Sequence, residues 1–387
     1  MPLFFLLVTL GTILDDVRCE ADPSQSYALY VPSNYSPDRA WPVIFAFDPG
    51  ARGRIPVERY QAAAETYGYI VAGSNNSRNG SWAGSNAAVQ AMTTDVARRF
   101  TIDDRRVYTA GMSGGARVAM AVALASSRIA GVIASSAGYP DSKPRKTVPF
   151  VVFGTAGTED FNCLEMRRLN RELTSPHRLA VFEGGHTWLS SELATEAVEW
   201  IEIQAMKSGR APRDQAKIDR IFAKRSADLA AQTSPQSTFK VLEGMVADFE
   251  GFEDVSALAA RAATLGRDKH VRDAQKKERE EDLREERETE EILALESRLS
   301  STPEQRPEWL GMLRDRWQKL SSRANAKADS ADRRMARRIL RGLSMGAAER
   351  APDPAYQKII DEFRPARGPT RGATPNSYRP AWRGAPG

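Results

Sequence analysis

The sequence predicts an α/β domain, in which a mostly parallel sheet carries helices on both faces, followed by an all-α region. Between residues 24 and 208, short β-branched, apolar runs alternate with segments whose apolar residues recur at helical spacing. From residue 213 to 350 the segments are helical and strongly charged, and no β-rich run occurs after about residue 245. A chain of 387 residues is long enough for two such parts.

The first 19 residues are expected to be a leader segment. Residues 3–14 are apolar, too few to cross a bilayer comfortably but of the length of a signal-peptide core. We therefore expect export to the periplasm, the cell envelope or the medium, or a cytoplasmic location if the run is not a functional signal. Against a signal peptide, no Lys or Arg precedes the run, and residues 15–18 make a poor cleavage site. No other segment has the length and apolarity of a transmembrane helix.

Charge and cysteine content exclude little. The formal net charge is +5, with 41% hydrophobic and 27% charged residues, and so mild a balance does not indicate a nucleic-acid partner. A lipoprotein anchor at Cys19 is a minor alternative, because the preceding residues are not small. The other cysteine is Cys163, so a disulfide framework is not indicated, and whether the two pair stays open.

The first part contains seven predicted strands and five predicted helices. The strands are 27–31, 43–47, 70–72, 107–110, 131–135, 150–153 and 178–182, and the helices are 57–67, 86–99, 114–126, 163–173 and 190–207. In open sheets of this kind, sites form at the carboxyl ends of the strands.

One strand ends in Gly-x-Ser-x-Gly. The segment Gly111-Met112-Ser113-Gly114-Gly115 runs from an apolar strand directly into an Ala-rich helix. This is the context of a nucleophile elbow, a turn so tight that the residues beside the serine must be small. The serine is then exposed near a helix N-terminus, where free N–H groups favour developing negative charge. A glycine-rich strand-to-helix turn without chemistry is the alternative.

A serine nucleophile needs a base and a group that orients the base. Of the three histidines, His186 follows a strand end and precedes the last helix of the domain, as a catalytic base requires. His177, at the start of a strand, and His270, in a charged helix, are expected to be structural or solvated.

The orienting acid is expected after strand 150–153. Asp160 is the first choice and the adjacent Glu159 the alternative, since an acidic loop residue can also cap the next helix. The chain order is then Ser113, Asp160, His186, which is the order of α/β-hydrolase triads.

An oxyanion needs two preorganised backbone donors. One is expected to be the N–H of Gly114. The other is expected in loop 48–53, where Pro49 has no N–H and Gly50 or Ala51 is therefore the donor. The same loop is equally consistent with an ordinary Pro-Gly turn.

Loop 73–82 is expected to border the same cleft. Arg78 and Trp82 are candidate substrate contacts, with Trp188 as a second apolar wall. A polar surface loop with one aromatic side chain packed beneath it is the alternative.

Residues 27–207 resemble an α/β-hydrolase of the esterase branch that contains polyhydroxybutyrate depolymerases, feruloyl esterases and dienelactone-hydrolase-like proteins. Three motifs carry the resemblance: the elbow around Ser113, the Gly-Thr-x-Gly-x-x-Asp run ending at Asp160, and the Gly-Gly-His-x-Trp run ending at Trp188. The resemblance implies a serine hydrolase that acts through an acyl-enzyme, with no metal and no organic cofactor.

The oxyanion loop departs from the family pattern. Many members have His-Gly where this chain has Asp48-Pro49-Gly50, so we expect an oxyanion geometry and a substrate that differ from those of the better-known members.

The second half is predicted to consist of helices over 213–232, 236–265, 268–300, 304–326 and 328–349. Leu313, Trp317 and Leu320 recur at helical spacing, which indicates helices packed on one another. Residues 276–291 interleave both charges and are predicted to form a solvated helix or coiled-coil arm, with a protein partner or self-association as alternatives. The tail 364–387 is rich in Pro, Gly and Arg and is predicted to be disordered.

The expected function is that of a serine hydrolase, with a carboxylic ester, small or polymeric, as substrate. A serine peptidase and a thioester or lactone hydrolase are alternatives, because the same triad serves all acyl transfers. The alternative of another class is a non-catalytic interaction protein that works through its helices.

Overall fold

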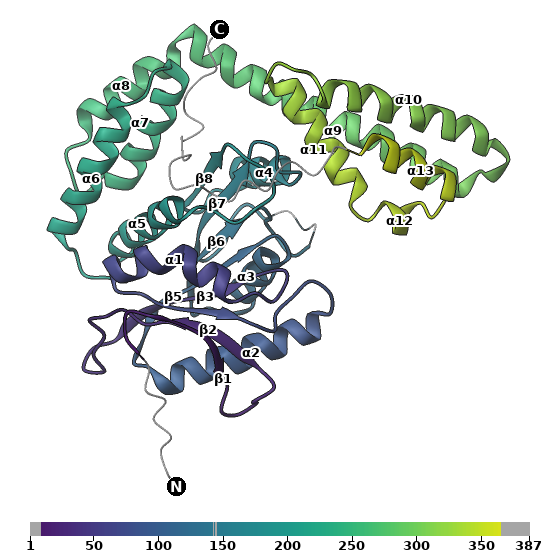
Figure 1. Ribbon diagram of the computed structural model, residues 1–387. Helices are drawn as coiled ribbons and strands as arrows, with labels where there is room; N and C mark the ends of the chain where they lie inside the picture. Colours follow the sequence, from purple (N-terminus) through teal and green to yellow (C-terminus); the bar gives the residue numbers. More distant parts are fainter. Residues whose placement is uncertain (1–8, 142, 144, 365–387) are drawn as a thin grey trace.

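The computed structural model describes residues 9–141, 143 and 145–364. One eight-stranded sheet forms the first part, in the order β1-β2-β4-β3-β5-β6-β7-β8 (Figure 1). β1 and β2 pair antiparallel, β2 pairs antiparallel with β4, and the remaining pairs are parallel. The strands are β1 (Ile13–Arg18), β2 (Ser26–Tyr30), β3 (Trp41–Phe47), β4 (Ile70–Ser74), β5 (Ile102–Met112), β6 (Ile129–Ser135), β7 (Val151–Gly157) and β8 (His177–Phe182).

Helices cover both faces of the sheet, and each face has its own apolar core. The helices are α1 (Arg54–Tyr67), α2 (Trp82–Arg99), α3 (Gly114–Ala125), α4 (Cys163–Glu172) and α5 (Ser191–Lys207). In β3, Val43 and Phe45 pack into the core under α2, α3 and α4, whereas Ile44 and Ala46 pack into the core under α1 and α5. Because successive side chains of a strand point to opposite faces, a strand buried on both faces is a continuous apolar run. This is the predicted α/β-hydrolase fold.

The edge strand β1 was not predicted. Residues 1–19 are predicted to be a leader, but residues 13–18 pair with β2, and both Val17 and Cys19 are buried. A strand of mixed polarity at a sheet edge has only one buried face, so its apolar signal is weak. Residues 1–8 lie outside the described residues, and export stays a prediction.

Both cysteines are buried and free, so the structure contains no Cys19–Cys163 bridge. Burial raises the pKa of the Cys19 thiol to about 11 and also raises that of Cys163. Both thiols therefore stay protonated at neutral pH, and a protonated thiol is a poor nucleophile.

The second part is helical, and its helices form two groups joined by the long α9 (Figure 1). The elements are α6 (Gln215–Ala230), α7 (Pro235–Phe249), α8 (Ser256–Arg267), α9 (Lys269–Ser301), η1 (Pro303–Gln305), α10 (Arg306–Ala324), α11 (Ala331–Ser344), α12 (Ala347–Arg350) and α13 (Pro354–Phe363). The predicted stripe with Leu313, Trp317 and Leu320 lies in the core shared by α9, α10, α11 and α13. No helix in the described ranges has the length and apolarity to cross a membrane.

Two predicted helices are broken, and one helix was missed. The predicted helix 236–265 is divided between α7 and α8 near Gly251, and the predicted helix 328–349 is divided at Gly346; both glycines have positive φ, of 87° and 69°. Glycine adopts this conformation without steric cost, and it ends a helix. α13 follows Asp353, whose side chain accepts from the N–H groups of Ala355 and Tyr356. The predicted disordered tail lies, apart from residue 364, outside the described residues.

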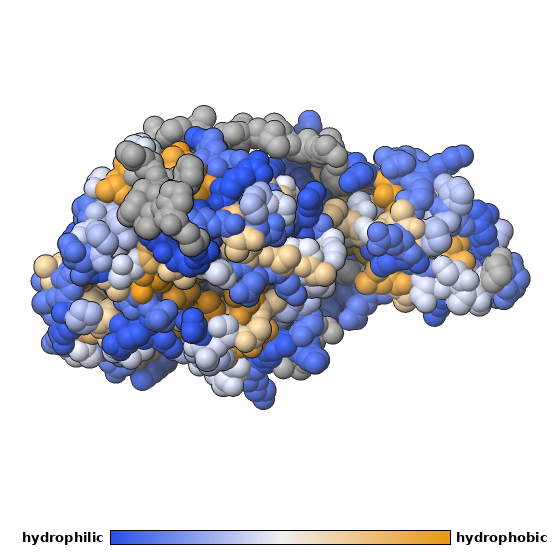
Figure 2. Space-filling view, turned by 90° about the horizontal axis from the view of Figure 1, so that it is seen from below, coloured by the Kyte–Doolittle hydropathy of each residue, from blue (hydrophilic) through white to orange (hydrophobic). Residues whose placement is uncertain are grey.

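Viewed from below the orientation of Figure 1, the group α10–α13 stands to one side of the sheet domain (Figure 2). Most of the coloured surface in this view is hydrophilic, with smaller groups of apolar residues between.

Candidate active site

Ser113 lies in a strained turn between β5 and α3. Its φ is 54°, a value that a residue other than glycine seldom adopts. The turn is closely packed, because a Cβ on Gly111 would meet the carbonyl oxygen of Gly115, and a Cβ on Gly115 would meet that of Phe47. The small residues of the motif are thus required by the approach of α3 to the ends of β3 and β5.

This packing predicts a difference between two glycines in first helical turns. Gly115→Ala should lower the free energy of unfolding by about 1–3 kcal/mol, because the new methyl group must displace the Phe47 main chain. Gly84→Ala, in the first turn of α2, is the control; nothing lies within 4 Å of its Cβ position, so it should be neutral or stabilising by up to ~1 kcal/mol. Urea unfolding of both variants checks this, and equal stability would contradict the packing argument.

Asp160 and His186 are joined by a hydrogen bond. They follow neighbouring parallel strands, β7 and β8, whose register sets Gly157 beside Phe182. His186 Nδ1 lies 2.8 Å from Asp160 Oδ1. Because a carboxylate only accepts, Nδ1 carries the proton and Nε2 is left as the acceptor, which is the tautomer that a general base needs. Asp160 is fully buried, and its Oδ1 also accepts from the N–H of Asn162 at 2.9 Å.

Phe161 holds the imidazole from one side. Its ring is stacked on that of His186, with the centroids 4.1 Å apart and the planes inclined by 26°. The His186 side chain is 19% exposed, so it is neither solvated nor closed off. The sequence analysis did not single out Phe161, although its place directly after the expected acid is a signal that points to it.

The turn after β6 connects three segments at this edge of the sheet. They are the turn at Ser113, loop 158–162 after β7, which contains Asp160 (the acid loop), and loop 183–190 after β8, which contains His186 (the base loop). Ser113 N–H donates to Ser135 O at 2.8 Å, and the next residue, Ser136, donates from Oγ to Thr187 O at 3.3 Å. Asn162 Nδ2 donates to Ser136 O at 2.7 Å. β6 lies between β5 and β7, so this turn joins the elbow to the loops of the acid and the base.

Among the described residues, no hydrogen bond joins Ser113 Oγ to His186. Catalytic hydrogen bonds are often long in free enzymes and shorten when substrate binds. The structure therefore joins Asp160 to His186 and presents Ser113 at the same edge of the sheet, and the complete triad stays a prediction.

The oxyanion loop is organised by a buried carboxylate. Asp48 Oδ1 accepts from Gly50 N–H and from Arg52 Nε, each at 2.8 Å, and Asp48 O accepts from Ala51 N–H at 3.1 Å. Both predicted donors, Gly50 and Ala51, are thus engaged by Asp48 rather than directed at a substrate oxygen. The N–H of Gly114, the first residue of α3, has no intrahelical acceptor, and its role stays a prediction.

Trp188 is predicted from sequence to be an apolar wall of the cleft. In the structure it instead supports loop 48–53. Its indole is buried, and Nε1 donates to Asp48 Oδ2 at 2.8 Å. The bond joins the loop that carries His186 to loop 48–53.

Loop 73–82 borders the oxyanion loop. Arg78 is exposed and forms an isolated antiparallel bridge with Gly50, while Trp82, the first residue of α2, is 47% exposed. Asn79 N–H donates to Pro49 O at 2.9 Å, and its side chain occupies the space that a Cβ on Gly114 would fill. Asn79 was not predicted, and contact of Arg78 and Trp82 with substrate stays a prediction.

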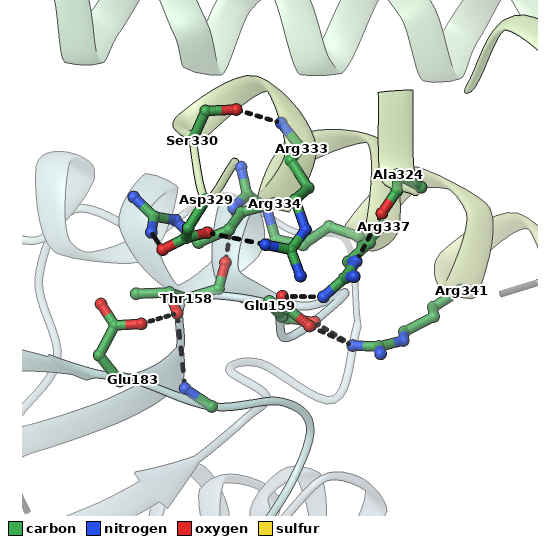
Figure 3. Close-up of polar contacts among 12 residues, drawn as sticks. Thr158, Glu159, Glu183, Ala324, Asp329, Ser330, Arg333, Arg334, Arg337 and Arg341 are labelled. Carbon is green, nitrogen blue, oxygen red and sulfur yellow. Dashed lines mark hydrogen bonds and ion pairs between the residues drawn. The ribbon is translucent and has the colours of Figure 1, made fainter. Parts of the chain in front are cut away.

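Glu159, the alternative acid, is engaged elsewhere. Its carboxylate pairs with Arg337 and Arg341 of α11, at 2.6 and 3.2 Å (Figure 3). His177 contacts main-chain oxygens with both ring nitrogens, as expected for a structural histidine. Within the described ranges, no group of three His, Cys, Asp or Glu residues is placed to hold a metal ion.

Comparisons with known proteins add distant likenesses. No protein-family model matches the sequence, and no curated protein matches it. An esterase of Pyrobaculum calidifontis is 12% identical over 51% of this chain and 86% of its own, with a TM-score of 0.40. A ferulic acid esterase is 15% identical over 49% and 97%, with a TM-score of 0.41. The dipeptidyl peptidase 4 of Porphyromonas gingivalis is 14% identical over 49% and 35%, with a TM-score of 0.38.

Proposed function

We propose that the protein is a serine hydrolase whose substrate is a carboxylic ester. The observation that carries the proposal is the Asp160–His186 hydrogen bond, at the sheet edge where the strained turn presents Ser113. A buried acid, an imidazole in the base tautomer and a serine at a helix N-terminus are the parts that acyl transfer requires.

In the proposed reaction, Ser113 Oγ attacks the ester carbonyl carbon and gives its proton to His186 Nε2. His186 then protonates the departing alkoxide, which leaves an acyl-enzyme. It next takes a proton from water, the hydroxide attacks the acyl carbon, and the acid is released as Ser113 regains its proton. Asp160 stabilises the imidazolium, and Gly114 N–H is the proposed oxyanion donor.

Active-site labelling tests the proposal. A fluorophosphonate probe should label the wild type once per chain, at Ser113, and should not label Ser113→Ala, because only an activated serine reacts at neutral pH. Matched p-nitrophenyl esters and p-nitroanilides separate ester from amide hydrolysis. An unlabelled wild type that hydrolyses neither class would overturn the proposal and leave the helices as the place to look for function.

A further inference from the structure

Helix α11 contacts the two residues that immediately precede the proposed triad acid. Arg338 Nη1 donates to the main-chain oxygen of Thr158 at 2.6 Å. Arg337 Nη1 donates to Glu159 Oε1 at 2.6 Å, and Arg341 Nη1 donates to both Oε2 and the main-chain oxygen of Glu159 at 3.2 Å (Figure 3). Residues nearly 180 positions apart in the chain thus meet beside the site.

The same helix contacts the residues around the base. A Cβ placed on Gly342 would lie 3.5 Å from the Cβ of Phe161, the residue whose ring is stacked on His186. A Cβ placed on Gly185 would lie 3.6 Å from Nη1 of Arg341. α11 therefore contacts the residues directly before and directly after Asp160 in the chain. It also lies near Gly185, the residue before His186.

α11 is itself held by a buried ion pair. Arg338 donates to both oxygens of Glu285 in α9, and both side chains are buried. Burial by itself would lower the pKa of Arg338, but the bonds to Glu285 raise it above its usual value, so the guanidinium stays charged. A guanidinium bound to both oxygens of a carboxylate has a defined direction, and this fixes Nη1 toward Thr158.

α9 also holds the helix that follows the acid loop. Asp282, which is buried, accepts from Arg167 Nη1 of α4 at 2.8 Å and from Arg171 of the same helix. The charged run 276–291, predicted to be a solvated helix, thus has a buried face against the sheet domain. Both ends of the acid loop are attached to the C-terminal helices.

The sequence of α11 explains why one side of the helix packs into the C-terminal core and another side contacts the acid loop. Ile339 and Leu343 lie in the apolar core of the C-terminal helices. Arg337, Arg338 and Arg341 recur at helical spacing, and all three donate to Thr158 or Glu159 of the acid loop.

We propose that α11 is a positioning element of the active site: Arg337 and Arg341, with Glu159 as their anchor, hold the acid loop so that Asp160 meets His186. Neither arginine touches substrate. The inference rests on the proposed function, and it makes the C-terminal helices part of the working enzyme rather than an appended module.

The test uses the full chain with two matched double variants. R337A/R341A removes both pairs to Glu159. R333A/R334A removes two arginines of the same helix that pair with Asp329, inside the helical region, and Arg334 and Arg337 have equally exposed side chains, 23% each. Arg338 is left intact in both variants, because Glu285 would otherwise be a buried unpaired charge.

R337A/R341A should lower kcat for p-nitrophenyl acetate by about 10- to 100-fold, with KM little changed, because a small displacement of a catalytic group has effects of this size. The downfield proton resonance of His186 Nδ1, assigned by its absence in His186→Ala, should be lost or broadened. R337K/R341K, which keeps the charges, should recover part of kcat. R333A/R334A should keep wild-type kcat and the resonance.

The inference is overturned if R337A/R341A retains both wild-type kcat and the resonance, or if both double variants lose activity and melting temperature equally. A wild type that is neither labelled nor active would overturn the proposed function and this inference together. A wild type that is active and labelled at Ser113, with R337A/R341A unchanged, would overturn this inference alone.

Discussion

Replacing Ser113 by alanine is expected to lower kcat for ester hydrolysis by about 10⁶-fold, the loss seen when a serine hydrolase is left without its nucleophile. Ser136, at the same sheet edge, also has a positive φ of 60°, but Ser113 is the residue that directly precedes a helix, α3. With alanine, no acyl-enzyme forms, and only the binding contribution to catalysis remains. Initial rates at saturating p-nitrophenyl acetate, with burst-phase analysis, measure the change.

Ser234→Ala is the matched control for this variant. Ser234 is also the N-cap of a helix, α7, and its Oγ accepts from the N–H of Ser237 at 3.1 Å. Its loss should lower the free energy of unfolding by about 1 kcal/mol and leave kcat unchanged. Turnover by Ser113→Ala at the level of Ser234→Ala would exclude Ser113 as the nucleophile.

Asp160→Asn is expected to lower kcat by about 10⁴-fold with little change in KM. Asp160 Oδ1 accepts from both His186 Nδ1 and Asn162 N–H, so an amide here either sets its N–H against both donors or turns its oxygen toward them and loses the charge that stabilises the imidazolium. The geometry is preserved, because the side chains have the same shape. Steady-state kinetics over a series of acyl chain lengths separates kcat from KM.

Glu159→Gln separates the two candidate acids. Glu159 pairs with Arg337 and Arg341 and makes no hydrogen bond with His186 among the described residues, so its loss should lower kcat by far less than that of Asp160. The reverse order of effects would make Glu159 the orienting acid and would contradict the arrangement described above.

Much of the site follows from local sequence. The elbow is predicted because Gly111, Ser113 and Gly115 are adjacent in the chain, and a strand-to-helix turn permits only small neighbours there. Asp160 and His186 are predicted because each follows a strand, and parallel strands end at one edge of the sheet. These inferences need only spacing and the rule that relates strand ends to sites.

The interpretations that failed depended on hydrogen-bond partners that the sequence pattern does not identify, one of them distant in the chain and one only two positions away. Trp188 is a large aromatic residue in a strand-end loop, which suggests a cleft wall, but its indole N–H donates to Asp48, 140 positions away. Gly50 has the freedom of an oxyanion donor, but the Asp48 carboxylate takes its N–H. The Asp48–Gly50 bond is a local Asx-type contact that the Asp-Pro-Gly sequence permits, whereas the Asp48–Trp188 bond is formed only when the chain is packed.

The sequence by itself determined the fold class, the strand-to-helix turn at Ser113 and the two strand-end residues that meet as Asp160 and His186, because each depends on periodicity or on neighbours in the chain. Only the tertiary structure decided what supports them. The sequence predicts a helix over 328–349 but no partner for its arginines, and Arg337 and Arg341 pair with Glu159 only because packing of the C-terminal helices brings them there. Long-range packing therefore determines which charged faces are solvent-exposed and which position the site.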